Sequence, residues 1–148
     1  MPHYKNILVG IDGSDEAKHA FQKAVDLAVD DQAHLIIAHV IDTRTYATIA
    51  QYDRTIVERA GKHANVLLDT YKEEAEKAGI KQVTTLVEHG SPKHVIPKEL
   101  AVKFDADVIV VGATGLNAVE RLLIGSVSSA IARYAPCDVV LVRNQQSY

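Results

Sequence analysis

Five short apolar runs, separated by segments with a helical repeat, restrict the folding of this chain more than any other feature. The runs cover residues 7–11, 35–40, 83–87, 108–111 and 139–142, and Val, Ile and Leu dominate them. Nearly continuous apolar runs of this length are typical of parallel strands that are buried on both faces. Strict alternation of strands and helices therefore predicts an α/β fold with a doubly wound parallel sheet and right-handed crossovers.

The topology of such a sheet follows from the order of the runs. The first three strands extend in one direction and the last two in the other, so the expected strand order is 3-2-1-4-5, with helices on both faces. The chain has 148 residues and shows no linker, repeat or low-complexity tract. We expect a single domain over residues 1–148, with a folded core from about 4 to 143.

Capping and helix-breaking residues predict where the helices begin and end. Ser14 is expected to cap the first helix, and Gly79 to end a long helix over 53–78. Ser91 should cap the next helix, and Pro97 predicts that this helix is bent or begins late. The first helix should bury Ala17, Ala20, Phe21, Ala24, Val25 and Ala28. The long helix should turn inward Ile56, Ala60, Ala64, Leu67, Leu68, Tyr71, Ala75 and Ala78.

Composition excludes several classes of partner. A net charge of −3 and only 5% aromatic residues, with no Trp, give neither a basic footprint nor a base-stacking platform, so we expect no nucleic-acid partner. No apolar stretch approaches roughly 18 residues and no secretory leader opens the chain, which predicts no membrane partner. A single cysteine, Cys137, fits a reducing compartment, and we expect a cytoplasmic protein.

The predicted ligand crevice opens at the carboxyl ends of the first and fourth strands, where the direction of the sheet reverses. Asp12 follows the first strand there, and Gly112 ends the fourth. A carboxylate at Asp12 can accept hydrogen bonds from ribose hydroxyls, although Asp-Gly-Ser is also a common Asx turn. Beyond Gly112, the last helix is expected to start at Ser126 as its N-cap and to end before Pro136.

The start of that last helix has the outline of a phosphate site. Glycines free the backbone, serine hydroxyls can donate, and the helix dipole favours an anion. An ordinary strand-to-helix turn explains the same glycines, and neither the Walker A pattern nor G-x-G-x-x-G is present. Seven histidines lack the spacing of metal ligands, and no serine lies in a nucleophile elbow. We therefore predict no catalytic residue and no metal site built by the protein.

The chain resembles the universal stress protein family from Tyr4 to Arg143. Gly112, Gly115, Gly125 and Ser126 match the G-x2-G-x9-G-S pattern of the family's ATP-binding branch, and residues 7–14 and 38–40 are similar to its first strand and the end of its second. The resemblance implies a Rossmann-like fold of the adenine nucleotide alpha hydrolase-like class. It also implies ATP as the ligand, with Mg²⁺ carried on the phosphates.

The resemblance assigns parts of the nucleotide to particular residues. The adenosine side would meet Gly10, Ile11, Asp12 and Val40. The ribose and phosphates would be wrapped by Gly112, Thr114, Gly115, Leu116 and Asn117. The phosphate tail would be received by Gly125, Ser126, Val127 and Ser128.

The family also forms homodimers through its last strand, here Val139, Val140, Leu141 and Val142. An apolar edge strand favours pairing with a second copy, although a short edge shielded by the tail 144–148 is the alternative.

The function implied is a nucleotide-binding stress-response or signalling module with little or no ATP turnover. Arg121 and Arg133 are the only cations near the phosphate end in the sequence, and we place Arg121 on an outer face. The alternatives are a slow ATPase or adenylate-processing enzyme, and a structural dimer with an unused cleft.

Overall fold

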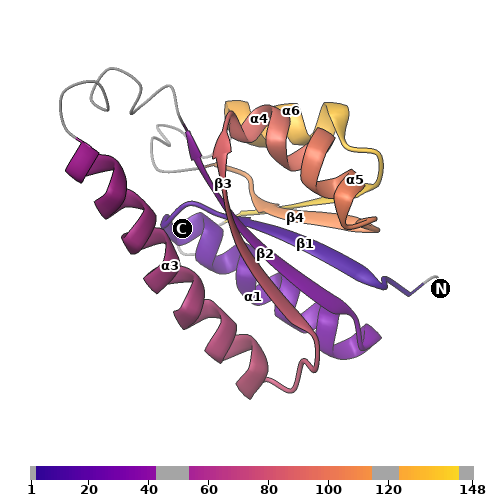
Figure 1. Cartoon of the computed structure of the whole chain (residues 1–148). Coiled ribbons are helices and arrows are strands. Elements are labelled where there is room, and N and C mark those ends of the chain that lie inside the picture. The colour runs from indigo at the N-terminus through magenta and orange to yellow at the C-terminus, as the bar shows by residue number, and fades with distance from the viewer. Residues whose placement is uncertain (1–2, 43–53, 115–123, 144–148) are drawn as a thin grey trace, which may run out of the picture.

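The protein forms a five-stranded, all-parallel sheet with the strand order β3-β2-β1-β4-β5 (Figure 1). The structure is a computed structural model and describes residues 3–42, 54–114 and 124–143. The strands are β1 (Asn6–Ile11), β2 (His34–Asp42), β3 (Val83–Gly90), β4 (Val108–Gly112) and β5 (Asp138–Val142). The predicted α/β fold and strand order are confirmed, with β3 and β5 as the two edges.

Helices cover both faces of the sheet, as predicted (Figure 1). One face packs against α1 (Asp15–Asp31) and α3 (Arg54–Lys77). The other packs against α4 (Pro92–His94), η1 (Val95–Leu100), α5 (Ala101–Lys103) and α6 (Ser126–Tyr134). Successive residues of β1 alternate between the two cores: Ile7 and Val9 face α1, whereas Leu8 faces the other layer. Burial on both faces explains the continuous apolar character of the central strands.

Helix α1 begins and packs as its sequence predicts. The Ser14 hydroxyl oxygen accepts a hydrogen bond from the Ala17 amide at 3.1 Å, and the buried residues are the six that the helical repeat indicated. Phe21 of α1 packs against Tyr71 of α3, with ring centroids 4.5 Å apart. This aromatic pair joins the two helices on one face of the sheet.

Helix α3 departs from prediction at both ends. Its described buried side chains begin at Ala64, and Ile56 remains 37% exposed, because the first turns of α3 lie away from the strands (Figure 1). At the other end, Ala78 lies beyond the last helical residue and is exposed. Gly79 follows with φ +103°, the left-handed conformation that ends a helix at little cost for glycine.

The helix containing Pro97 is widened rather than late. It starts at Pro92, as predicted, and changes at Val95 to the π-helical pitch, in which the Ala101 amide donates to the Ile96 carbonyl. A proline inside a regular α-helix clashes with the carbonyl four residues earlier, and a wider turn relieves that contact. The Pro97 side chain is fully buried.

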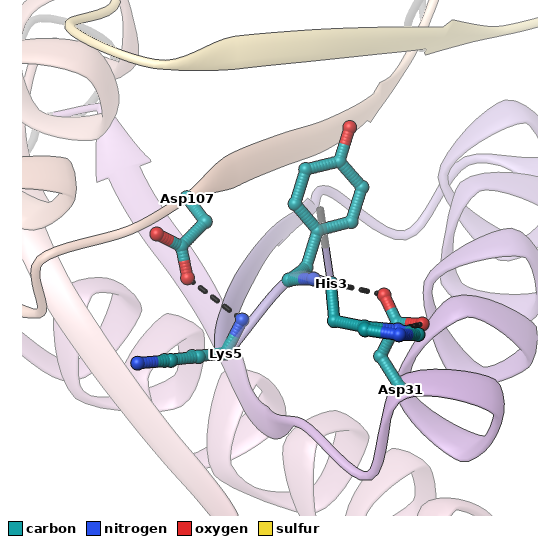
Figure 2. Close-up of polar contacts among 5 residues, drawn as sticks. His3, Lys5, Asp31 and Asp107 are labelled. Atoms are coloured by element: carbon teal, nitrogen blue, oxygen red, sulfur yellow. Dashed lines mark hydrogen bonds and ion pairs between the residues drawn. The ribbon is translucent and has the colours of Figure 1, made fainter. Parts of the chain in front are cut away.

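Aspartates hold the N-terminal segment at the pole of the sheet where the strands begin (Figure 2). The Tyr4 amide donates to Asp31 Oδ2 at 2.9 Å, and His3 Nδ1 donates to Asp31 Oδ1 at 3.0 Å. The Lys5 amide donates to Asp107 Oδ2 at 2.7 Å. The start of the chain is therefore fastened to the end of α1 and to the start of β4.

Candidate functional site

The carboxyl ends of β1 and β4 lie side by side, because the two strands pair in parallel with Val9 opposite Val110. Asp12 directly follows β1, and Gly112 ends β4. Helix α1 starts three residues beyond Asp12, and α6 starts on the opposite face of the sheet. The sheet thus brings together the two chain segments on which the predicted crevice depends.

In the segment that follows β1, the Asp12 side chain accepts hydrogen bonds from Ser14 of the same segment. Asp12 Oδ1 accepts from the Ser14 amide at 2.9 Å and from the Ser14 hydroxyl at 2.5 Å. This is the Asx turn that the sequence left open as an alternative. Because both bonds end on Oδ1, the second carboxylate oxygen of this exposed side chain takes no part in the turn. The Ser14 hydroxyl oxygen in turn accepts a hydrogen bond from the Ala17 amide at the start of α1.

Helix α6 begins differently, and the prediction that Ser126 is its N-cap is wrong. Gly125 occupies the cap position with φ −63° and ψ 160°, and Ser126 is the first helical residue. Gly125 is the N-cap because its carbonyl accepts the first hydrogen bond of the helix, from the Ser129 amide at 2.9 Å. With glycine as cap there is no side-chain acceptor, so helix geometry leaves the amides of Ser126, Val127 and Ser128 without a partner inside α6.

Gly112 is needed for packing, which the sequence did not reveal. A Cβ atom on Gly112 would lie 2.8 Å from Glu16 Cβ and 3.0 Å from the Glu16 carbonyl carbon. The first turn of α1 therefore lies directly against the end of β4. Gly10 is less crowded, since its nearest neighbour would be the terminal methyl of Ile96 at 3.2 Å.

Ser128 is buried, with 5% of its surface exposed, and its hydroxyl donates to the Gly112 carbonyl at 2.5 Å. The Gly125 amide donates to the Ala113 carbonyl at 2.7 Å. Two hydrogen bonds therefore join the first turn of α6 to the residues that end β4.

The remaining predicted residues lie at the ends of strands, at the start of α6 or outside the described part of the chain. Ile11 is buried at the end of β1, Val40 is half-buried in β2, and Thr114 is half-buried just beyond β4. Ser126 is exposed and Val127 is half-buried at the start of α6. Gly115, Leu116 and Asn117 lie outside the described residues.

His39, near the carboxyl ends of β1 and β2, is a residue that sequence reasoning did not select. Its Nδ1 lies 2.9 Å from the Ile11 carbonyl oxygen, which can only accept, so Nδ1 carries the proton. The bond joins β2 to the last residue of β1. Its one sequence signal was a polar side chain inside an otherwise apolar run, immediately before Val40.

Cys137 lies at the opposite pole, just before β5, and its environment suppresses its reactivity. Burial, followed by the nearby carboxylates of Asp138 and Asp107, raises the pKa of the thiol to about 11. The side chain is therefore a neutral thiol at physiological pH rather than a nucleophile. Within the described ranges, no group of three or more His, Cys, Asp or Glu side chains is arranged to hold a metal ion.

No helix in the described part of the chain combines the length and apolar character needed to cross a membrane.

Sequence relatives match almost the whole chain. A putative universal stress protein of Staphylococcus saprophyticus is 51% identical over 146 residues, which cover 99% of this chain and 87% of that protein. A second, from Staphylococcus aureus strain USA300, is also 51% identical, over 99% of this chain and 88% of its own length.

Solved structures share the fold. The universal stress protein UspA from Lactobacillus plantarum superposes with a TM-score of 0.85 at 30% identity, covering 97% of this chain and all of that one. A universal stress protein in complex with cAMP superposes with a TM-score of 0.72 at 28% identity, covering 96% of this chain and 98% of that one. The model of the universal stress protein family matches residues 3–143. The chain therefore belongs to the universal stress protein family.

Proposed function

We propose that this protein is an ATP-binding module of the cytoplasmic stress response, which holds ATP in the crevice between β1 and β4 with little or no turnover. The observation that carries the proposal is the contrast between the starts of α1 and α6 at the carboxyl ends of the strands. Helix α1 is capped by the Ser14 hydroxyl, whereas α6 has a glycine cap and three first-turn amides without intrahelical acceptors. An anion at the start of α6 would also meet the positive end of the helix dipole.

The sequence pattern agrees with this placement of the phosphates. Gly125 and Ser126 form the last part of the G-x2-G-x9-G-S pattern, and they are the cap and first residue of α6. The exposed Ser126 hydroxyl can donate to a phosphate oxygen beside the Ser126 and Val127 amides. Gly112 and Thr114 would approach the nucleotide from the end of β4, and Gly115, Leu116 and Asn117 would complete the loop.

The adenosine half would lie toward β1 and β2. Asp12 Oδ2 would accept from the ribose, since the Asx turn uses Oδ1, and Gly10, Ile11 and Val40 would meet the ring. The cAMP complex of a family member with 28% identity supports an adenine nucleotide as the ligand. A triphosphate rather than a cyclic monophosphate is favoured by the run of amides at α6, which suits a longer chain of phosphates.

The charges of the described residues near the start of α6 support the proposal of slow or absent turnover. Phosphoryl transfer needs a cation on the transferred group and a positioned water or base. Arg133 is in the last turn of α6, at the end of the helix away from the proposed phosphates, and Arg121 lies outside the described residues. Mg²⁺ would arrive on the nucleotide, because the described residues include no cluster of His, Cys, Asp or Glu side chains that could hold it. A slow ATPase or adenylate-processing enzyme is the second candidate, and no described contact favours it.

We also propose that the protein is a homodimer paired through β5. Strand β5 is an edge of the sheet, and Val139, Val140, Leu141 and Val142 are each only half-buried. An apolar edge with unpaired backbone groups is stabilised by a second copy of the same strand about a two-fold axis.

Nucleotide retained through purification tests the binding proposal. Wild type is expected to carry adenine nucleotide, identified by mass spectrometry of the released ligand, and a Gly115→Val, Gly125→Val double variant is expected to be empty. Gly61→Ala is the matched control, because a Cβ on Gly61 meets nothing within 4 Å and lies in α3, far along the chain from the site. Equal nucleotide content in all three proteins, or none in any after incubation with Mg-ATP, would contradict ATP binding at α6.

Steady-state phosphate release separates the two candidates. For a binding module, release by wild type stays at the level of spontaneous hydrolysis, and Ser126→Ala changes nothing. Release well above that level which falls sharply in Ser126→Ala would establish the slow ATPase instead.

A further inference from the structure

We propose that Ser128 is a positioning residue for the phosphate amides rather than a phosphate ligand. This inference rests on the proposed function, because it concerns how the same site is held in shape. Its role is to hold the first turn of α6 against the end of β4, so that the Ser126 and Val127 amides stay aimed at one place.

The first step concerns the single proton that the Ser128 hydroxyl can donate. A serine hydroxyl has one proton to donate, and here it is donated to the Gly112 carbonyl at 2.5 Å. Phosphate oxygens at neutral pH are chiefly acceptors, so a ligand phosphate would need that same proton. The side chain is also 5% exposed, whereas the neighbouring Ser126 is exposed and first in the helix.

The second step is the geometry of the attachment. The Gly125 amide donates to the Ala113 carbonyl at 2.7 Å, and the Ala113 amide donates to the Val142 carbonyl at 2.8 Å. The Gly125 bond fixes only the cap residue of α6 to the end of β4. The Ser128 bond, three residues further along, adds a second point and so restricts the rotation of the first turn.

The third step concerns what stands behind Gly112. The first turn of α1 lies against Gly112, within van der Waals contact of Glu16. Gly112 is thus packed against the first turn of α1, and its carbonyl accepts from Ser128 on the α6 side. Removing the hydroxyl leaves this carbonyl without its side-chain donor and leaves the first turn of α6 attached to the end of β4 through the Gly125 amide, while the Ser126 and Val127 backbones are chemically unchanged.

The experiment compares four proteins: wild type, Ser128→Ala, Ser128→Thr and Ser129→Ala. Ser129 is an exposed neighbour in α6, so its variant controls for helix propensity. Calorimetric titration with Mg-ATP is expected to show about five- to twentyfold weaker binding by Ser128→Ala, the size expected for a buried hydrogen bond. Adenosine, which lacks phosphates, should bind within about twofold of wild type, and Ser128→Thr and Ser129→Ala should bind ATP like wild type.

A measurement without nucleotide separates positioning from direct contact. Amide hydrogen exchange at residues 126–129, followed by NMR, is expected to be faster in nucleotide-free Ser128→Ala than in wild type. ATP affinity unchanged in Ser128→Ala would overturn the proposal. Weaker ATP binding with unchanged exchange would also overturn it, since that result indicates a direct phosphate contact.

Two provisions keep the outcomes distinct. If wild type binds neither ATP nor adenosine, the proposed function fails, and the exchange measurement still decides whether Ser128 holds the turn. If Ser128→Ala lacks the circular dichroism spectrum of the folded protein, Ser128→Cys replaces it, because a thiol keeps the volume and is a weak donor. The same loss of ATP affinity and the same faster exchange are then expected.

Discussion

At the scale of single residues, two small residues at the proposed crevice have structural reasons for their size. Gly112 has no Cβ because the backbone of α1 lies where that atom would be, and Ser128 is small enough to be buried while reaching the Gly112 carbonyl. Either residue would be assigned to ligand binding by motif alone. Their contacts instead join three elements, so packing and the proposed binding depend on the same few atoms.

The crowding at Gly112 predicts the outcome of adding one methyl group. Gly112→Ala should lower the free energy of unfolding by about 1–3 kcal/mol, because the contact involves backbone atoms of Glu16 that cannot rotate away. Gly61→Ala, in an uncrowded helical position, should raise it by about 0.5–1 kcal/mol. Urea denaturation followed by circular dichroism measures both. Equal stabilities for Gly112→Ala and wild type would show that α1 shifts without strain.

At the scale of whole elements, helix ends differ in whether a side chain caps them, and the two edge strands differ in how apolar their residues are. Helix α1 has a side-chain cap, whereas α6 has none. The helical run from Pro92 to Lys103 accommodates a buried proline by widening to a π-helix. Of the two edge strands, β3 is the longer and carries polar residues, whereas β5 presents four consecutive apolar ones.

The difference between the edges predicts where a charge disrupts assembly. Leu141→Lys places a cation in the proposed β5 interface, where two-fold symmetry brings it near its own copy, and it should convert a dimer to a monomer. Glu88→Lys, in the opposite edge strand β3, is the matched control and should leave the dimer intact. Sedimentation velocity gives the mass of each, with circular dichroism as a check of folding. A wild type that sediments as a monomer, or dimers of both variants, would contradict pairing through β5.

At the scale of the molecule, the two poles of the sheet have separate tasks. The carboxyl ends of the strands carry the proposed crevice. The amino ends carry the aspartates that hold the N-terminal segment, including Asp31 with His3 and the Tyr4 amide (Figure 2). Tyr4 extends this network by donating from its hydroxyl to Asp138 at the start of β5. The hydrogen bonds that hold residues 3 and 4 are therefore remote from the proposed crevice.

The Asp31 contacts make part of the overall stability depend on acid. The hydrogen bond from His3, and then that from the Tyr4 amide, lower the pKa of Asp31, so the folded state favours the carboxylate. A lowered folded pKa gives stability that is fully present above about pH 4 and is lost as pH falls through that pKa. Asp31→Asn should therefore be less stable than wild type at pH 7 and lose less stability on acidification.

Urea denaturation between pH 7 and pH 3 measures this effect. Asp30→Asn, a change at an exposed neighbour in α1, is the control and should follow the wild-type profile. Parallel profiles for Asp31→Asn and wild type would show that the hydrogen bonds to Asp31 contribute no net stability.

Several features were predictable because they depend on neighbours in the sequence. The stripe from Ala17 to Ala28 and the stop at Gly79 follow from helical periodicity and from backbone conformation. The exposure of Ile56 was not predictable, since the repeat gives a face but not how far the partner sheet extends. The cap at Gly125 in place of Ser126 was missed because a one-residue shift of a helix start depends on what its amides and carbonyls meet.

The sequence by itself determined the order of the strands, the edge at which they end and the residues near that edge. These depend on apolar periodicity and on the handedness of crossovers, which act along the chain. Only the tertiary structure decided which partner each polar or small group takes. Ser128 donates to a carbonyl 16 residues away, and Gly112 accommodates Glu16 of a different helix. Such pairings require the elements to be packed first, because distance in space, not spacing in the sequence, selects the partner.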